Sequence, residues 1–140
     1  MRELSDIDVV GVVGAGTMGN GIAQVAATVG YDVVMRDIDA AYVESGLDSI
    51  DDSLDRLSSK GRLDDAPMKI RSRITGTTDL DDLAAADVVV EAAVENMDVK
   101  RDIFADLDDV TDGDVVLATN TSTLSITTIA SATDRASDVI

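Results

Sequence analysis

The sequence contains no cysteine, no histidine and no tryptophan, and its 140 residues include one proline, one phenylalanine and two tyrosines. Without cysteine the chain has no disulfide, no thiolate nucleophile and no cysteine-ligated metal, which favours a cytoplasmic protein. Without histidine it has no side chain that ordinarily titrates near neutral pH. No apolar run approaches the roughly 18 residues of a membrane-spanning helix. The N-terminus, "MRELSDID", is too polar for a secretory signal.

Positive charge is also scarce, because 11 lysines and arginines stand against 28 aspartates and glutamates and leave a net charge of −17. A surface this acidic repels nucleic acid and anionic membranes, so we expect neither as a partner. The aspartates are spread along the chain between apolar runs, which indicates a folded surface rather than an acidic tail. Few lysines, many aspartates and a core rich in alanine and valine are typical of a halophile's protein. We expect such a protein to gain stability as salt screens its surface.

An apolar fraction of 45% in 140 residues is enough for one domain with a buried core, and no repeat or linker divides the chain. Continuous apolar runs such as 87–93 and 114–119 are typical of strands buried on both faces of a sheet. Residues 17–30, 38–60 and 96–110 instead have the spacing of amphipathic helices. The alternation of the two patterns predicts an α/β fold, with a doubly wound, mostly parallel sheet and helices on both faces.

The expected strands are 7–14, 31–37, 74–80, 87–93, 114–119 and the beginning of one more at 138–140. The expected helices are 17–30, 38–60, a short one begun by Pro67, 81–86, 96–110 and one that follows a loop at 120. In three helices, apolar residues recur at helical spacing: Met18, Ile22, Val25, Ala26 and Val29; Val43, Leu47, Ile50, Leu54 and Leu57, on one face; and Val99, Ile103, Phe104 and Leu107, which are expected to point inward.

Residues 14–19 match the pattern G-x-G-x-x-G, which follows a strand and opens a helix in dinucleotide-binding folds. In that pattern Gly14 permits the tight turn, Gly16 lets the backbone approach a pyrophosphate, and Gly19 lets the helix pack closely on the strand. The start of the helix offers unpaired N–H groups and the positive end of its dipole to the phosphates. A glycine-rich turn without a ligand is the alternative, and the position between a buried strand and a helix favours dinucleotide binding.

Asp37 closes the next predicted strand, 18 residues after Gly19, where an acid accepts the hydroxyls of the adenosine ribose. The same carboxylate repels a 2′-phosphate and so favours NAD over NADP. Arg36 is the opposing observation, because a guanidinium at this position is able to pair with that phosphate.

Two further polar clusters follow predicted strands, and ligands in an open α/β sheet bind beyond the carboxyl ends of the strands. Glu95, Asn96 and Lys100 follow the strand at 87–93, and residues 120–123 follow the strand at 114–119. The spacing leaves two interpretations open. Either both clusters complete the ligand site, or they have ordinary structural roles. In the second case Asn120 or Thr121 caps a helix, and Glu95 and Lys100 form a solvated ion pair.

Three stretches, "GAGTMGNGIAQ", "EAAVENMDVKRDIFADLD" and "LATNTSTLSIT", resemble the N-terminal domain of 3-hydroxyacyl-CoA dehydrogenases, in particular the short-chain 3-hydroxybutyryl-CoA type. The resemblance covers essentially the whole chain, and three motifs in order are more specific than a glycine loop. It implies NAD as cofactor, an acyl-CoA as substrate, and interconversion of (3S)-3-hydroxyacyl-CoA and 3-oxoacyl-CoA in fatty-acid β-oxidation or a butyrate-type pathway.

The resemblance also implies roles for individual residues. Ser122 matches the serine that hydrogen-bonds the 3-oxygen of the substrate, and Asn120 beside it is the second candidate for a catalytic role. Ser53 and Lys60 match contacts to the CoA end, where an ammonium suits the phosphates, with ordinary helix surface as the alternative. The implied cofactor contacts are Gly14, Ala15, Gly16, Thr17, Met18, Gly19, Asp37, Ala92, Glu95, Lys100 and Ser122.

In the family, the general base is a histidine oriented by a glutamate, and a mostly helical C-terminal domain closes over the acyl chain and forms the dimer interface. The 140 residues end where the strand that leads to that histidine would begin. Loss of a positioned base costs about 10²–10⁴-fold in rate, so we expect binding of NAD without turnover. We interpret residues 1–140 as an incomplete NAD-binding domain of a full dehydrogenase. One chain of a split enzyme and a non-catalytic NADH-binding module are the alternatives.

Overall fold

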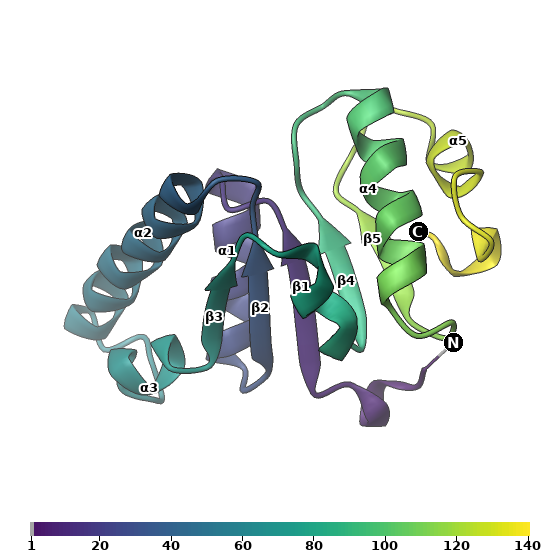
Figure 1. Ribbon diagram of the computed structural model, residues 1–140. Helices are drawn as coiled ribbons and strands as arrows, with labels where there is room; N and C mark the ends of the chain where they lie inside the picture. The colour runs from purple at the N-terminus through teal and green to yellow at the C-terminus, as the bar shows by residue number, and fades with distance from the viewer. Residues whose placement is uncertain (1) are drawn as a thin grey trace.

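The computed structural model describes residues 2–140 and places a five-stranded parallel sheet at the centre of the molecule, with strand order β3-β2-β1-β4-β5 (Figure 1). The β1 strand pairs with β2 on one side and with β4 on the other, so the strand order reverses beside β1. The predicted doubly wound sheet is confirmed. Its strands are β1 (Val9–Val13), β2 (Asp32–Arg36), β3 (Ile74–Thr77), β4 (Val88–Glu91) and β5 (Val116–Thr119).

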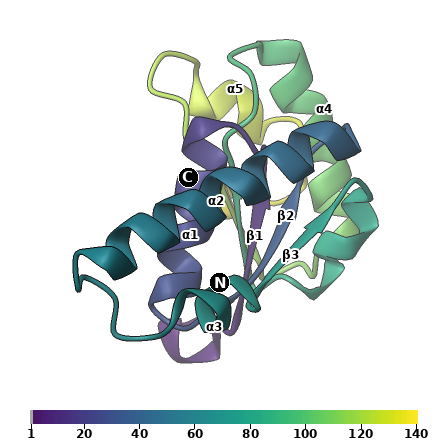
Figure 2. The same cartoon turned by 90° about the vertical axis from the view of Figure 1, so that its left-hand side faces the viewer.

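Helices cover both faces of the sheet, as Figures 1 and 2 show. One group packs around α1 on one face, and the other group packs around α4 on the opposite face. The first group is α1 (Thr17–Thr28), α2 (Ala40–Ser59) and α3 (Pro67–Arg71). The second is α4 (Met97–Val110), α5 (Ile126–Ala130) and the 3₁₀ helix η2 (Leu80–Ala85). Two more 3₁₀ turns are η1 (Leu4–Asp6) and η3 (Ala136–Asp138).

The core has two parts, one on each face, because side chains in a strand point alternately to opposite sides. In β1, Val10 and Val12 pack with the α1 group, while Val13 packs with the α4 group. The apolar residues on one face of α2 are buried or half-buried, and so are Phe104 and Leu107 in α4. Among residues 2–140, no helix has both the length and the apolar character needed to cross a bilayer.

The helix α1 is where predicted, but its buried face does not follow its apolar spacing. Met18, Val25 and Val29 are 57%, 66% and 69% exposed, and the buried residues are Gly19, Ala23 and Ala27. The helix lies so close to the sheet that a Cβ atom on Gly19 would overlap the carbonyl oxygen of Gly14. Only small side chains fit on this face, so the larger valines point to solvent.

The chain comes back to the sheet beside β5 at its C-terminal end. Val139 forms an isolated parallel bridge with Leu117. The N–H of Thr119 donates to the carbonyl of Ile140 over 2.7 Å, and the N–H of Ile140 donates to the carbonyl of Leu117 over 3.1 Å. The predicted start of a further strand at 138–140 is confirmed only at Val139, because Asp138 still belongs to η3.

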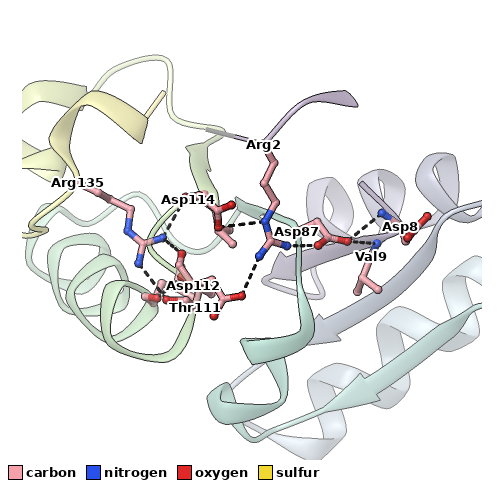
Figure 3. Close-up of polar contacts among 10 residues, drawn as sticks. Arg2, Asp8, Val9, Asp87, Thr111, Asp112, Asp114 and Arg135 are labelled. Carbon is pink, nitrogen blue, oxygen red and sulfur yellow. Dashed lines mark hydrogen bonds and ion pairs between the residues drawn. The ribbon is translucent and has the colours of Figure 1, made fainter. Parts of the chain in front are cut away.

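Two arginines join segments at the end of the sheet opposite the carboxyl ends of the strands (Figure 3). Arg2 forms ion pairs with Asp87, Asp112 and Asp114, while Asp87 also accepts the N–H groups that begin β1. Burial raises the pKa of the Asp87 carboxyl, but these amide hydrogen bonds and Arg2 outweigh it and leave the pKa below its ordinary value. Arg135 is buried and donates to the Asp108 carboxylate and to the carbonyls of residues 108, 111, 112 and 115.

Candidate cofactor site

A pocket of about 450 Å³ lies at the carboxyl ends of β1, β2 and β4, and the strand order reverses between β1 and β4. This is the place at which open α/β sheets bind ligands. Its walls come from the glycine loop, the end of β2, the start of α2, the loop after β4 and α4. The lining residues are Val13, Gly14, Ala15, Gly16, Arg36, Asp37, Ile38, Tyr42, Ser45, Ala92, Ala93, Val94, Val99 and Ile103.

The glycine loop turns sharply at Gly14, whose φ of +109° is unfavourable for any residue with a side chain. A Cβ atom there would also lie 2.7 Å from the carbonyl oxygen of Ala92, so the glycine loop and the loop after β4 touch through their backbones. Gly16 differs from both neighbouring glycines, because a Cβ atom on it would meet no protein atom within 4 Å. Nothing in the protein requires glycine at position 16, so the open space beside it fits a ligand.

The start of α1 faces this open space without a side-chain cap. Gly16 is the N-cap residue and makes no side-chain hydrogen bond. The N–H groups of the first turn, at Thr17, Met18 and Gly19, have no intrahelical acceptor at a helix start. Unpaired amides and the positive end of the helix dipole suit an anion such as a pyrophosphate, so the chain fits the dinucleotide that its sequence predicts.

The carboxylate of Asp37 joins the end of β2 to the glycine loop. Its Oδ2 atom accepts the N–H of Ala15 over 2.9 Å, and its Oδ1 atom accepts the N–H of Ile38 over 2.7 Å. A carboxylate has about four lone-pair positions, so both oxygens can still accept ribose hydroxyls. The opposing residue, Arg36, donates from Nε to the carbonyl of Thr78 over 3.1 Å, which ties its guanidinium toward β3.

The pocket also has an apolar wall that the sequence did not identify. It includes Ile38 and Tyr42 near the start of α2 and Val94 in the loop after β4. Val99 was predicted to face the core, but it is 38% exposed and lines this pocket together with Ile103. The wall combines segments far apart in sequence. Its only local indication in the sequence was an aromatic residue, Tyr42, soon after Asp37.

The second predicted cluster surrounds Glu91, at the carboxyl end of β4. Lys100 is 0% exposed, and its Nζ atom lies 2.6 Å from Glu91 Oε2, 3.2 Å from Glu95 Oε1 and 3.3 Å from the carbonyl oxygen of Ala93. The interpretation of Glu95 and Lys100 as a solvated pair is therefore wrong, because the ammonium is inside the protein. The sequence missed Glu91, although an acid in the apolar run "DVVVEAA" was a local sign of it.

Glu95 connects this cluster to the loop that carries Ser122. The hydroxyls of Thr121 and Thr123 donate to Glu95 Oε2 over 2.7 Å and 2.9 Å. These hydrogen bonds, together with Lys100, hold the pKa of the Glu95 carboxyl below its ordinary value. Ser122 lies between the two threonines and is exposed.

Helix capping does not explain the residues that follow β5. The cap of α5 is Ser125, which accepts the N–H of Thr128, so the interpretation of Asn120 or Thr121 as a helix cap is wrong. Asn120 is exposed at its side chain and donates its N–H to the carbonyl of Glu91 over 2.8 Å. In α4, the cap is Asn96, which accepts the N–H of Val99.

The predicted CoA contacts lie outside the pocket. Ser53 is half-buried in α2, and its Oγ atom accepts the side-chain amide of Gln24 over 2.9 Å. Lys60 is exposed at the C-terminal end of α2, roughly 22 Å along the helix axis from Ser45 in the pocket wall. Of the predicted dinucleotide contacts, Gly14, Ala15, Gly16, Asp37 and Ala92 line the pocket, whereas the pair Ser53 and Lys60 lies further along α2. The other predicted contacts are not among the lining residues: Thr17, Met18, Gly19, Glu95, Lys100 and Ser122.

Comparison with known proteins identifies the family that the three sequence motifs resemble. Residues 9–140 match the family model described as "3-hydroxyacyl-CoA dehydrogenase, NAD binding domain". The chain is 47% identical over 130 residues to a probable 3-hydroxybutyryl-CoA dehydrogenase of Deinococcus radiodurans, covering 93% of this chain and 47% of the relative. It is 49% identical over 127 residues to a 3-hydroxybutyryl-CoA dehydrogenase of Bradyrhizobium diazoefficiens, covering 90% of this chain and 43% of that protein.

The crystal structure of (S)-3-hydroxybutyryl-CoA dehydrogenase from Ralstonia eutropha superposes with a TM-score of 0.92 and 48% identity, covering 96% of this chain and 48% of that one. The chain thus spans about half the length of the relatives it matches. The fold, the glycine loop and the family match agree, and the chain belongs to the 3-hydroxyacyl-CoA dehydrogenase family as an NAD-binding domain.

Proposed function

We propose that this chain is the NAD-binding part of an enzyme that oxidises (3S)-3-hydroxyacyl-CoA to 3-oxoacyl-CoA. The observation that carries the proposal is the position of the Ser122 loop. The loop follows β5 at the same sheet edge as the dinucleotide pocket and is tied to the loop after β4 by hydrogen bonds from Thr121 and Thr123 to Glu95. An exposed hydroxyl at that edge suits a substrate oxygen that must lie beside the nicotinamide.

Within this scheme each part of the chain has a distinct task. When bound, NAD accepts the hydride from the substrate carbon. Gly14, Gly16 and the start of α1 hold the pyrophosphate, and Asp37 holds the adenosine ribose. Ser122 orients the 3-oxygen of the substrate. Lys60 and Ser53, on the outer part of α2, contact the CoA moiety.

The chain has no histidine, and so it has no side chain suited to accept the hydroxyl proton near neutral pH. We therefore expect the 140 residues to bind NADH without oxidising it when acetoacetyl-CoA is added. The test is NADH binding and NADH oxidation in the same sample, in molar KCl. Turnover by this chain alone would contradict the assignment of the proton transfer to a residue outside it.

A chimera distinguishes the dehydrogenase from a module that only binds NADH. Joining this chain to the C-terminal half of the Deinococcus radiodurans relative supplies the remainder of the enzyme. We expect the chimera to reduce acetoacetyl-CoA, and we expect Ser122→Ala in it to lower kcat/KM by roughly 10²-fold or more, as loss of a hydrogen bond to the reacting oxygen does. A folded chimera that binds NADH but never oxidises it would favour the binding module.

The proposal also covers the cellular setting, the assembly and the partners of the enzyme. The family resemblance supports a cytoplasmic enzyme of fatty-acid β-oxidation or a butyrate-type pathway that forms a homodimer through a C-terminal domain. The net charge of −17 supports salt adaptation and argues against nucleic acid or anionic membranes as partners.

A further inference from the structure

We propose that Glu91 is a positioning residue of the cofactor site, which holds the loops after β4 and β5 in the arrangement that the nicotinamide half of the dinucleotide requires. This inference rests on the proposed function, because it assumes a dinucleotide that extends from Asp37 toward β5. It concerns a residue that touches neither pocket nor solvent, since Glu91 is 0% exposed and absent from the pocket lining.

The carboxylate of Glu91 joins three separate segments of the chain. Its Oε1 atom accepts the hydroxyl of Thr119, at the end of β5, over 2.7 Å. Its Oε2 atom accepts the N–H of Ala93, in the loop after β4, over 2.7 Å, and the ammonium of Lys100, in α4, over 2.6 Å. The backbone carbonyl of Glu91 also accepts the N–H of Asn120. One residue thus fixes the start of both loops.

Lys100 extends this fixation to the Ser122 loop. Its ammonium lies between Glu91 and Glu95, and the Glu95 carboxylate in turn accepts the hydroxyls of Thr121 and Thr123. A continuous path of ion pairs and charged hydrogen bonds therefore runs from inside the sheet to both neighbours of Ser122. Charged hydrogen bonds are shorter and stronger than neutral ones, so they suit this task.

A gain in stability alone does not explain well why Glu91 and Lys100 form a buried ion pair. Burial of two charges removes their hydration, and apolar pairs of similar volume often stabilise proteins equally well or better. The chain has a second largely buried ion pair, Arg135 with Asp108 at 2.6 Å, at the opposite end of the sheet. Both pairs join segments of the fold, but only the Glu91 pair lies beneath the two loops of the site. The second pair is therefore a matched control.

ADP-ribose and NADH separate positioning from stability. Both ligands reach the glycine loop and Asp37, while only NADH places a nicotinamide over the carboxyl ends of β4 and β5. If Glu91 positions these two loops, its removal weakens NADH and leaves ADP-ribose nearly unaffected. If Glu91 only stabilises the fold, both affinities change in the same ratio.

The experiment measures dissociation constants for both ligands and thermal unfolding, in molar KCl, for the wild-type chain, Glu91→Gln and Asp108→Asn. In Glu91→Gln the amide oxygen can still accept from Ala93 and Lys100, and the NH₂ group can donate to the Thr119 hydroxyl, which accepts as well as donates. The main change is therefore loss of the negative charge that pairs with the buried Lys100 ammonium. We expect Glu91→Gln to raise the Kd for NADH about tenfold or more, which is ~1.4 kcal/mol, and the Kd for ADP-ribose less than about threefold. Asp108→Asn should lower the unfolding temperature and leave the ratio of the two constants as in wild type.

A double variant, Glu91→Gln with Lys100→Met, covers the case in which Glu91→Gln does not fold, because it leaves no unpaired buried charge. We expect it to fold and still to bind NADH weakly relative to ADP-ribose. An unchanged ratio in Glu91→Gln, or a wild-type ratio in the double variant, would overturn the inference. A wild-type chain that binds ADP-ribose and NADH equally well would also overturn it while leaving dinucleotide binding intact. Binding of neither ligand by the wild type would refute the proposed function itself.

Discussion

The carbonyl oxygen of Gly14 occupies the position that a side-chain Cβ atom would take on Gly19. The turn after β1 and the first turn of α1 are therefore in direct backbone contact. The substitution Gly19→Ala cannot be accommodated by a rotamer change, because the obstacle is main chain. We expect it to unfold the chain or to cost roughly 3 kcal/mol or more, as severe overpacking does. Thermal or chemical unfolding measures the effect.

Gly21→Ala is the matched control, since Gly21 lies in the same helix and a Cβ atom there meets nothing within 4 Å. Alanine favours a helix by up to about 1 kcal/mol over glycine, so this variant should be as stable as wild type or more stable. Equal destabilisation by the two substitutions would mean that helix propensity, not the contact with Gly14, determines the result.

Gly16→Ala should weaken cofactor binding and leave the stability of the fold nearly unchanged, whereas Gly19→Ala should destabilise the fold. A Cβ atom on Gly16 meets no protein atom within 4 Å, so we expect an unfolding free energy within about 1 kcal/mol of wild type. The added methyl group occupies the space that the pyrophosphate needs, so NADH affinity should fall about tenfold or more. Fluorescence titration with NADH measures it. Undiminished NADH binding by a folded Gly16→Ala variant would show that the phosphates lie elsewhere.

Asp37→Asn should reduce the preference for NADH over NADPH. The neutral amide no longer repels a 2′-phosphate, and it accepts ribose hydroxyls less well, so the two affinities should converge by about tenfold or more. Asp39→Asn is the control, because Asp39 is exposed and caps α2 by accepting the N–H of Ala41. If Asp39→Asn changes the preference as much as Asp37→Asn does, the discrimination depends on general surface charge.

Asp87 should contribute to stability in a pH-dependent way. Burial raises the pKa of its carboxyl. Hydrogen bonds from the N–H groups of Asp8 and Val9, together with the charge of Arg2, lower this pKa by more than burial raises it, so it lies below its ordinary value in the folded chain. Because the pKa is lower in the folded chain, the ionised carboxylate stabilises the fold at every pH above the ordinary aspartate pKa. This stabilisation is lost as the pH falls through the folded-state pKa. We therefore expect Asp87→Asn to cost roughly 1–3 kcal/mol at neutral pH, and this cost to shrink below about pH 4.

Chemical unfolding of wild type and Asp87→Asn between neutral pH and acid checks this expectation. Asp109→Asn, at an exposed position in α4, serves as control and should have little effect at any pH. A cost of Asp87→Asn that stays constant with pH would mean that the carboxylate acts through packing rather than through its charge.

Salt should stabilise the chain, because its net charge of −17 produces repulsion that molar KCl screens. We expect the unfolding temperature to rise from low to molar KCl. A triple variant with asparagine at Asp48, Asp52 and Asp55, which are exposed in α2, should need less KCl to reach the same unfolding temperature. A fall in stability between low and molar KCl would contradict salt adaptation.

The sequence predicts best the features that depend on neighbours along the chain. The strand before Gly14, the helix after Gly16 and the acid at Asp37 form one local unit, and the structure places all three as predicted. The buried face of α1 could not be read from the sequence, because apolar spacing cannot reveal that the helix touches the backbone of the glycine loop. Val25 and Val29 are therefore exposed while Ala23 and Ala27 are buried.

Contacts between distant segments could not be predicted from the sequence. From the sequence, Lys100 was either a cofactor contact or part of a solvated pair, since lysines are mostly exposed. Glu91, nine residues before it and in a strand rather than the same helix, instead draws it inside. The same holds for Arg2, whose partners at Asp112 and Asp114 follow it by more than 100 residues. Each of these pairs exists only because the parallel sheet brings the ends of its strands together.

The burial of Lys100 also determines how the protein reacts with its chemical surroundings. The chain has three lysines, and Lys60 and Lys69 are exposed while Lys100 is not. An acylating reagent that attacks free amines should therefore modify Lys60 and Lys69 in the native protein and leave Lys100 untouched. Acylation of Lys100 would occur only in molecules whose pair with Glu91 has opened, so the third lysine acts as an internal reporter of the intact site.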